Sequence, residues 1–481
     1  MLIIPQLVLP ELDRQTVERN AEFSSFVSHL SVLGPVLLRG TTVSSSMSLI
    51  TQLTQSHQSK STHSQTAPLP LYIEGLELNE ADSAVAMLNL GARVAFFLRR
   101  IGLEQAASRT STLQSFPRSR VGLSTRITMG TGAHAVSEAM DSLVTMVDET
   151  NMVAEHLMLD MIISPLSDIV AFLAAIKELL DIYRMQRRAA IQIYVCIPAS
   201  AMLSNDTVDT ITAMALEAVH LCVLPELVPV SESAASHHMP STKIVRSPYL
   251  DGDRGLVDLL HAYVGTLRSD RKDGLFATVV CDSLGVCLGL VYSNTDSIRI
   301  AFMQRRAVFF SRSTGKVWYK GASSGRTQEL LSIRIDCDSD ALQFKVIEND
   351  TPFCHKLTNT CWGDVTGVAQ LERSILDRRH NAAAGSFTAR LLRDKDLLNN
   401  KLIEQTEELA EAVEKEDIAE QASKVLYFLL TKCVSEDVSL AYVVSKLDAR
   451  SWQITRQTAL HSSSTSVLTP NTKGDRPRSQ I

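Results

Sequence analysis

Residues 336–361 read DCDSDALQFKVIENDTPFCHKLTNTC, and this stretch determines the character of the middle of the chain. Asp336, Asp338 and Asp340 stand at alternate positions, with Cys337 between the first two. If the piece is extended, the three carboxylates lie on one face and Cys337 on the other, because strand side chains alternate. Carboxylates suit a hard cation such as Mg²⁺, whereas thiolates suit Zn²⁺. The stretch therefore predicts two kinds of metal ligand placed back to back.

Two further cysteines follow in the same stretch, Cys354 directly before His355 and then Cys361. Three cysteine ligands leave one tetrahedral position open, which is the pattern of catalytic zinc rather than of closed structural zinc. The spacing alone leaves a second interpretation open. Cysteine is often a small buried residue, and alternating aspartates can form a solvated turn.

Length and composition restrict the class of protein. At 481 residues the chain predicts two to four domains of roughly 150 residues each. A net charge of −6 gives no basic surface, so nucleic acid is not an expected partner. Eight cysteines in this length do not make a disulfide scaffold. The most apolar long stretch, residues 161–180, contains Asp168, Lys177 and Glu178, so it predicts a buried helix rather than a membrane span. We expect a cytoplasmic protein.

Residues 1–245 alternate apolar runs with helical patterns. Apolar runs such as 35–40, 92–98 and 191–198 predict strands, and residues 136–158 predict a helix. Strands that are apolar throughout, separated by helices, predict a mostly parallel sheet covered on both faces. We expect an N-terminal α/β domain, although nothing in it indicates a function.

The composition changes after a polar linker at residues 231–242. Residues 246–368 predict an antiparallel, β-rich domain with hairpins, and with a helix that Asn294 or Thr295 caps. Residues 369–456 predict an all-α helical bundle, and residues 457–481 a disordered tail. The predicted class is thus a multidomain α+β protein.

Several spaced motifs resemble a known family. Five of them resemble segments of phosphoribosyl-AMP cyclohydrolase: DGLFATVVCD (273–282), LGLVYSN (288–294), SRSTGKVWYKGASSG (311–325), IDCDSDAL (335–342) and PFCHKLTNTCWG (352–363). Three further motifs resemble segments of phosphoribosyl-ATP pyrophosphohydrolase: LERSILDRRHNAAAGSFTARLL (371–392), KLIEQTEELAEA (401–412) and VLYFLL (425–430). This order resembles fungal multifunctional histidine-biosynthesis proteins. Those proteins continue into a histidinol dehydrogenase domain, and we expect none of that activity here.

The resemblance implies a zinc-dependent homodimer that opens the adenine ring of phosphoribosyl-AMP at a site between subunits. It assigns Zn²⁺ to Cys337, Cys354 and Cys361, and Mg²⁺ to Asp336, Asp338 and Asp340. The substrate segment that it implies comprises Arg312, Trp318, Lys320, Gly321, Ser324 and Gly325, with the two cations suited to phosphate. His355 is predicted to be a general acid/base or to orient a neighbouring group, and a purely structural histidine is the alternative.

The pyrophosphohydrolase segment departs from its family at the metal site. Where the family has four carboxylates on facing helices, this chain has Gln405, Glu408, Gln421 and Lys424, whose formal charges sum to zero. Because charged lysine offers no lone pair, we expect weak metal binding and reduced activity on phosphoribosyl-ATP in a bundle that still folds. Glu408 is expected to pair with Lys424. The neighbouring Glu404, Glu407 and Glu420 are an alternative ligand set, and a non-catalytic paralogue kept for binding or assembly is the alternative function.

Overall fold

The structure is a computed structural model of the chain. It describes isolated residues 47, 50, 51 and 383 and the ranges 3–8, 26–39, 71–99, 112–128, 133–162, 166–185, 191–197, 205–214, 219–223, 225–226, 257–348, 352–381 and 385–454. The predicted linker at 231–242 and tail at 457–481 lie outside these residues.

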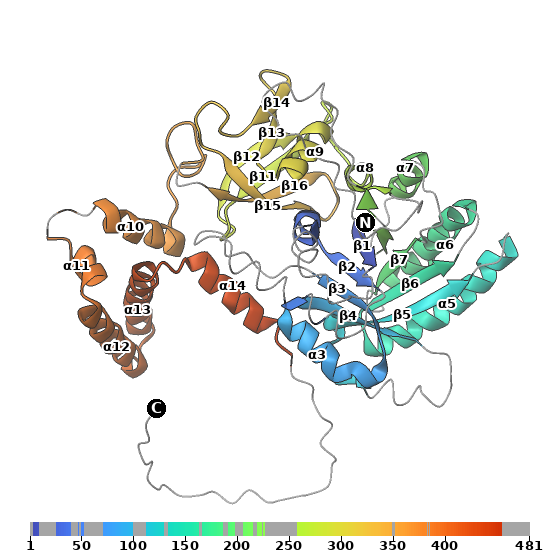
Figure 1. Cartoon of the computed structure of the whole chain (residues 1–481), viewed down its shortest axis with the longest axis horizontal. Coiled ribbons are helices and arrows are strands. Elements are labelled where there is room, and N and C mark those ends of the chain that lie inside the picture. The colour runs from blue at the N-terminus through green and yellow to red at the C-terminus, as the bar shows by residue number, and fades with distance from the viewer. Residues whose placement is uncertain are drawn as a thin grey trace, which may run out of the picture.

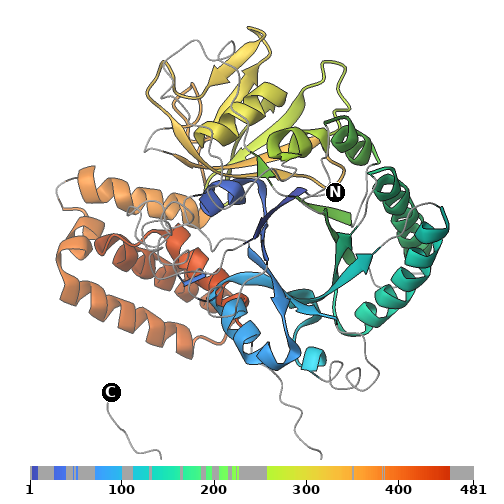
Figure 2. The ribbon, with the colours of Figure 1, turned by 45° about the vertical axis from the view of Figure 1, so that its right-hand side comes forward.

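The N-terminal part is a closed barrel of eight parallel strands (Figures 1 and 2). Its strands are β1 (Ile3–Val8), β2 (Val36–Arg39), β3 (Leu71–Leu76), β4 (Ala92–Leu98), β5 (Val121–Thr128), β6 (His156–Ile162), β7 (Gln192–Cys196) and β8 (Val219–Val223). The barrel closes where β1 pairs with β8, with Ile3 opposite Leu221. The outer helices are α3 (Ala81–Leu90), α5 (Ala133–Val153), α6 (Leu166–Met185) and α7 (Asn205–Ala213).

The prediction of an α/β domain is confirmed, but the expected sheet covered by helices on both faces is wrong. Helices lie outside the barrel, and the inner face is filled by its own side chains, including Leu37, Phe96, Met158 and Tyr194. Strands that are apolar on both faces fit either arrangement, so their composition cannot tell an open sheet from a closed one. Inside, a Cβ on Gly122 would lie 2.6 Å from the Phe96 ring, so glycine gives that ring its space.

Two helix predictions in this region have wrong boundaries. The helix expected over residues 136–158 ends at Val153, and β6 begins at His156. The apolar stretch 161–180 is not one helix, because it contains the end of β6 and most of α6. Within the described ranges, no helix combines the length and the apolar composition that a bilayer crossing needs.

The middle of the chain forms a six-stranded sheet in the order β14-β13-β12-β11-β16-β15. Its strands are β11 (Phe276–Cys281), β12 (Cys287–Ser293), β13 (Val308–Ser311), β14 (Lys316–Tyr319), β15 (Gln328–Ile335) and β16 (Ala341–Glu348). The expected all-antiparallel pairing is wrong at one place, since β16 returns from its hairpin with β15 to lie parallel to β11. Asn294 caps α9 (Thr295–Gln304) as predicted, accepting a hydrogen bond from the Ser297 amide at 2.9 Å.

The C-terminal part is helical, as predicted. Its helices are α10 (Gly367–Asn381), α11 (Phe387–Arg393), α12 (Lys395–Glu411), α13 (Lys415–Ser435) and α14 (Leu440–Ser451). Two small apolar clusters hold them together: Ile375 with Leu430 and Val434, and Leu391 with Leu398 and Phe428.

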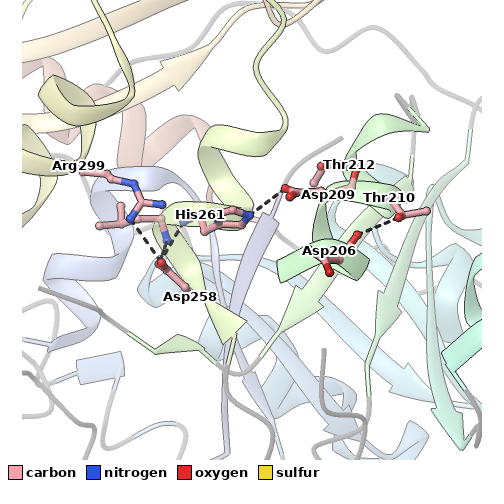
Figure 3. Close-up of polar contacts among 8 residues, drawn as sticks. Asp206, Asp209, Thr210, Thr212, Asp258, His261 and Arg299 are labelled. Carbon is pink, nitrogen blue, oxygen red and sulfur yellow. Dashed lines mark hydrogen bonds and ion pairs between the residues drawn. The ribbon is translucent and has the colours of Figure 1, made fainter. Parts of the chain in front are cut away.

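The barrel contacts the six-stranded sheet domain through α7 and α8 (Leu259–Gly265), as Figure 3 shows. Asp258 begins α8 by accepting hydrogen bonds from the Leu260 and His261 amides, and it pairs with Arg299 of α9 at 3.4 Å. The His261 ring lies 2.8 Å from Asp209 of α7. A strand pair of β9 (Pro225–Glu226) and β10 (Val257–Asp258) adds to this contact. Polar contacts from two helices thus join the two domains.

The barrel also holds the segment that follows α14. Asn89 exchanges two hydrogen bonds with the backbone of Ile454, at 2.7 and 3.1 Å, and Ile454 is buried. Arg120 donates to the Trp452 carbonyl, and the Arg93 guanidinium stacks on the Trp452 ring at 4.4 Å. The barrel is therefore in contact with both other parts of the chain.

Candidate metal and substrate site

The three aspartates lie in the turn between β15 and β16, and the predicted extended alternation is wrong. The Asp336 carboxylate accepts the backbone amides of Asp340 and Ala341, each at 3.1 Å. Cys337 is not separated from the acids by a sheet, because its Sγ lies 3.9 Å from an Asp338 oxygen. The turn nevertheless places one oxygen of each aspartate within 4.8 Å of the others. A turn thus achieves the clustering that the alternation of a strand was expected to give.

The three carboxylates of this cluster repel one another. Burial, together with the neighbouring Asp338 and Asp336 carboxylates, raises the pKa of Asp340. Within the described part of the chain, no lysine or arginine forms an ion pair with any of the three. Three oxygen ligands with unneutralised charge are the donor set that a hard divalent cation prefers.

Two of the three predicted zinc thiols are neighbours. The Lys356 amide, the Thr358 hydroxyl and the Cys361 thiol lower the pKa of Cys354, which is buried. Burial and the nearby Cys354 raise the pKa of Cys361, whose own amide donates to the Leu288 carbonyl at 2.8 Å. A thiol with a lowered pKa is more often thiolate, the form that binds metals.

The third thiol, Cys337, does not join this pair within one chain. It is exposed in the turn of the aspartates. Among the described residues, the aspartates are the one group of three or more His, Cys, Asp or Glu whose ligand atoms lie within 4.8 Å of one another. One copy of the chain therefore offers a two-thiol site and, separately, one exposed thiol.

Two further predicted residues lie beside the thiol pair. The Lys320 Nζ donates to the Phe353 carbonyl at 2.5 Å and lies 4.4 Å from the centre of the Phe353 ring. Its positive charge opposes the rise in the pKa of Cys361. His355 is exposed, with Nδ1 3.8 Å from the Cys354 sulfur. A cation and an imidazole are thus available next to the sulfurs.

The remaining residues of the predicted substrate segment lie in two places, an open pocket and a nearby turn. Arg312 and Trp318 line an open pocket of about 750 Å³ over β12 to β14, and the Arg312 guanidinium stacks on Tyr292 at 3.8 Å. Lys320 does not line this pocket. Ser324 is exposed, and the turn that contains it has positive φ at Gly321 (+81°) and Gly325 (+70°). The predicted segment therefore extends from the pocket to the thiol pair.

Among the described residues, the helical site brings no three acids close enough together to share a metal ion. Gln405 of α12 is buried, and Lys424 of α13 pairs with Glu420 at 3.0 Å and donates to Gln421 at 3.2 Å. The predicted pair of Glu408 with Lys424 is not the one observed, because Glu420 is one helical turn away on the same helix and reaches the ammonium directly. The hydrogen bond to Glu420 is the main reason that the pKa of Lys424 is raised, and the negative charge of Glu408 adds a smaller contribution.

Sequence reasoning missed a charged cluster at the carboxyl ends of the barrel strands. Arg39 bonds to Glu74 at 2.9 Å and to Asp160 at 3.1 Å, Arg126 reaches Asp160 at 3.4 Å, and Ser124 donates to Glu74 at 2.7 Å. The sequence pattern that could have predicted this cluster is a charged residue two positions after an apolar or buried residue in several of the strands. Two arginines balance two carboxylates, so the cluster is neutral.

Two family models match this chain. Phosphoribosyl-AMP cyclohydrolase matches residues 289–363, and phosphoribosyl-ATP pyrophosphohydrolase matches residues 368–451. The histidine biosynthesis bifunctional protein HisIE of Shewanella oneidensis is 33% identical over 189 residues, which are 38% of this chain and 89% of that protein. The chain belongs to this bifunctional histidine-biosynthesis family. The family resemblance inferred from the sequence motifs is confirmed.

Fungal relatives of the family are longer. The histidine biosynthesis bifunctional protein his7 of Schizosaccharomyces pombe is 43% identical over 202 residues, 42% of this chain and 48% of that protein. The trifunctional protein of Saccharomyces cerevisiae is 43% identical over 195 residues, 40% of this chain and 24% of that protein. The chain thus matches about half or less of each fungal relative. A solved structure titled as a putative lyase/mutase from Burkholderia cenocepacia matches 46% of this chain and 76% of its own, with 12% identity and a TM-score of 0.29. Nothing in these comparisons favours the non-catalytic alternative.

Proposed function

We propose that this protein hydrolyses the adenine ring of phosphoribosyl-AMP in histidine biosynthesis, using zinc held by Cys354 and Cys361 of one copy and by Cys337 of a second. The observation that carries the proposal is the adjacent thiol pair within the segment matched by the cyclohydrolase family, with the pKa of Cys354 lowered. A two-thiol site beside an exposed third thiol suits a metal shared across a two-fold axis. The proposed active form is therefore a homodimer.

The thiols fit zinc and the aspartates fit magnesium, each by donor type and charge. Bound zinc would supply a water of lowered pKa for attack on the ring carbon. His355, next to Cys354, is proposed to deliver or accept the proton at the ring nitrogen through its imidazole. Arg312 and Trp318 are proposed to hold the phosphoribosyl part in the pocket over β12 to β14, where a fixed guanidinium opposes phosphate charge.

Shared zinc predicts complementation between inactive variants. Cys337→Ser and Cys361→Ser should each abolish turnover of phosphoribosyl-AMP. When the two variants are unfolded together and refolded, half of the dimers contain one chain of each, and one of their two sites is intact. We expect about a quarter of the wild-type rate. Cys433→Ser, a half-buried cysteine of α13 with no assigned role, is the matched control and should stay active. If the mixture has no more activity than either variant alone, zinc is not shared in this way.

We propose that the attached helical module has lost most of its phosphoribosyl-ATP pyrophosphohydrolase activity. A polyphosphate–magnesium complex needs a negative cluster, and here Lys424 and two glutamines replace three carboxylates. The neighbouring Glu420 is engaged by Lys424, and Glu404 is engaged by Lys401 at 2.8 Å, which argues against their taking over as ligands.

Restoring the acids should restore the second activity. The triple variant Gln405→Glu, Gln421→Glu and Lys424→Asp is expected to release pyrophosphate from phosphoribosyl-ATP with Mg²⁺, at least tenfold faster than the wild type. Phosphoribosyl-AMP turnover in the same preparation is the internal control for folding. Rapid pyrophosphate release by the unmodified protein would contradict the proposed loss.

A further inference from the structure

A second pair of thiols lies on the hairpin formed by β11 and β12, outside the proposed ligand set. Cys281 ends β11, Cys287 begins β12, and the two are register partners in the antiparallel pair, next to a register shift between Val280 and Cys281. The Asp282 amide donates to the Val286 carbonyl at 3.0 Å, so the next pair outward, Cys281 with Cys287, is a non-hydrogen-bonded pair. Residues in such a pair have Cα atoms about 4.5 Å apart and side chains on the same face.

This spacing falls within the range that a disulfide spans, about 4.4–6.8 Å between Cα atoms. Both cysteines are free thiols, with Cys281 buried and Cys287 half-buried. The side-chain amide of Gln343 donates to the Cys281 sulfur at 3.7 Å, which fixes the position of that sulfur. Burial and the adjacent Cys287 raise the pKa of Cys281. The more accessible Cys287 is the side from which an oxidant reaches the pair.

The hairpin is also joined to the proposed zinc ligands. The residue after Cys287 is Leu288, whose carbonyl accepts the Cys361 amide at 2.8 Å. A Cβ on the following Gly289 would lie 2.9 Å from the Cys361 sulfur, so the strand passes directly beneath that thiol. A change in covalent structure at Cys287 is therefore one residue away from the backbone that supports Cys361.

We propose that Cys281 and Cys287 are a modification site that forms a reversible disulfide across the β11–β12 hairpin. With glutathione disulfide as oxidant, the Cys287 sulfur attacks one glutathione sulfur and releases one glutathione thiolate. The Cys281 thiol gives up its proton, and its sulfur displaces the second glutathione from Cys287. Two protein thiols are oxidised to one S–S bond, and glutathione disulfide is reduced to two glutathione molecules.

The test maps the bridge in the full-length, zinc-loaded protein. Trypsin releases residues 273–299 as one peptide that contains these two cysteines and no others. After treatment with glutathione disulfide and then iodoacetamide, we expect most of this peptide to be two hydrogens lighter and unalkylated. Dithiothreitol should restore two alkylation sites. Cys287→Ser should abolish the change, whereas Cys433→Ser should keep it.

The barrel supplies an internal comparison. Cys196 and Cys222 are register partners on β7 and β8, and both are fully buried, so they should stay reduced. A peptide 273–299 that still takes two alkyl groups, glutathione attached without a bridge, or equal oxidation of Cys196 and Cys222 would each overturn the proposal. The mapping needs no catalytic assay, so it can fail or succeed independently of the proposed cyclohydrolase function. Because wild-type mapping decides the matter, a variant that fails to fold does not weaken the test.

Discussion

His29 should make the contact between the barrel and the sheet domain sensitive to acid. The residue lies in the helical segment 26–30, and its ring stands edge-on to Phe302 of α9, with centroids 4.5 Å apart. Its Nε2 is buried and has no hydrogen-bond partner among the described residues. Burial, with the charge of Arg305 nearby, lowers the pKa of His29 from 6.5 to about 4. The folded protein therefore keeps this ring neutral.

The direction in which stability changes with pH follows from proton binding at His29 in the folded and unfolded states. Between pH 6.5 and 4 the unfolded chain binds a proton at His29 and the folded chain does not, so folding stability falls as the pH falls. The contribution is fully present above pH 6.5. The loss reaches about 2 kcal/mol at pH 5 and about 3 kcal/mol once the pH is below 4. This is a large fraction of a typical domain's stability.

The measurement is urea unfolding of the wild type and of His29→Gln at pH 7.5 and pH 5. Glutamine has no proton to gain in this range, so the variant should lose about 2 kcal/mol less than the wild type between the two pH values. His220, with a pKa lowered to about 3, titrates in both proteins and cancels in the difference. Equal losses in the two proteins would refute the reasoning, whatever the effect of the substitution at pH 7.5.

Two further predictions concern the sheet domain. Gly321→Ala should destabilise it by about 3 kcal/mol or prevent folding, because the new Cβ would lie 2.2 Å from the Arg326 carbonyl carbon. Gly325→Ala, with a similar φ but open space around it, should cost only about 1 kcal/mol in the same calorimetric scan, and equal effects would contradict the steric argument. His355→Ala should lower turnover of phosphoribosyl-AMP at least a hundredfold at unchanged zinc content, whereas full turnover would exclude a catalytic role.

How far the sequence predicts this structure depends on whether the signal is local. The cap at Asn294, one of two predicted, and the presence of hairpins such as β11–β12 in residues 246–368 depend on a few adjacent residues, and the sequence predicts both. The closure of the barrel depends on pairing between Ile3 and Leu221, which are far apart in the chain, and no local pattern carries that information. Strand β6 was read in part as helix because HLMLDMI has apolar residues that suit either spacing.

The candidate site shows the same division. The ligand types in residues 336–361 were recognisable from their chemistry, but their geometry was not, since Asp336 turns the chain through its own carboxylate. Sequence alone placed Glu408 opposite Lys424 because the two family positions face each other. The lysine instead reaches Glu420, which is nearer on its own helix. Competition between near and distant partners is decided by side-chain reach, which the family pattern does not encode.

Charge compensation separates the sites that are built for a cation from those that are not. At the barrel mouth, Arg39 and Arg126 neutralise two carboxylates, and in the helical bundle Lys424 pairs with Glu420. The turn that begins at Asp336 has three carboxylates and, within the described residues, no cationic partner, and it raises the pKa of Asp340. Such crowding costs free energy unless a cation offsets it. A protein that keeps this cost at one turn, while pairing the acids at the barrel mouth with arginines, has the electrostatics expected of a functional metal site there.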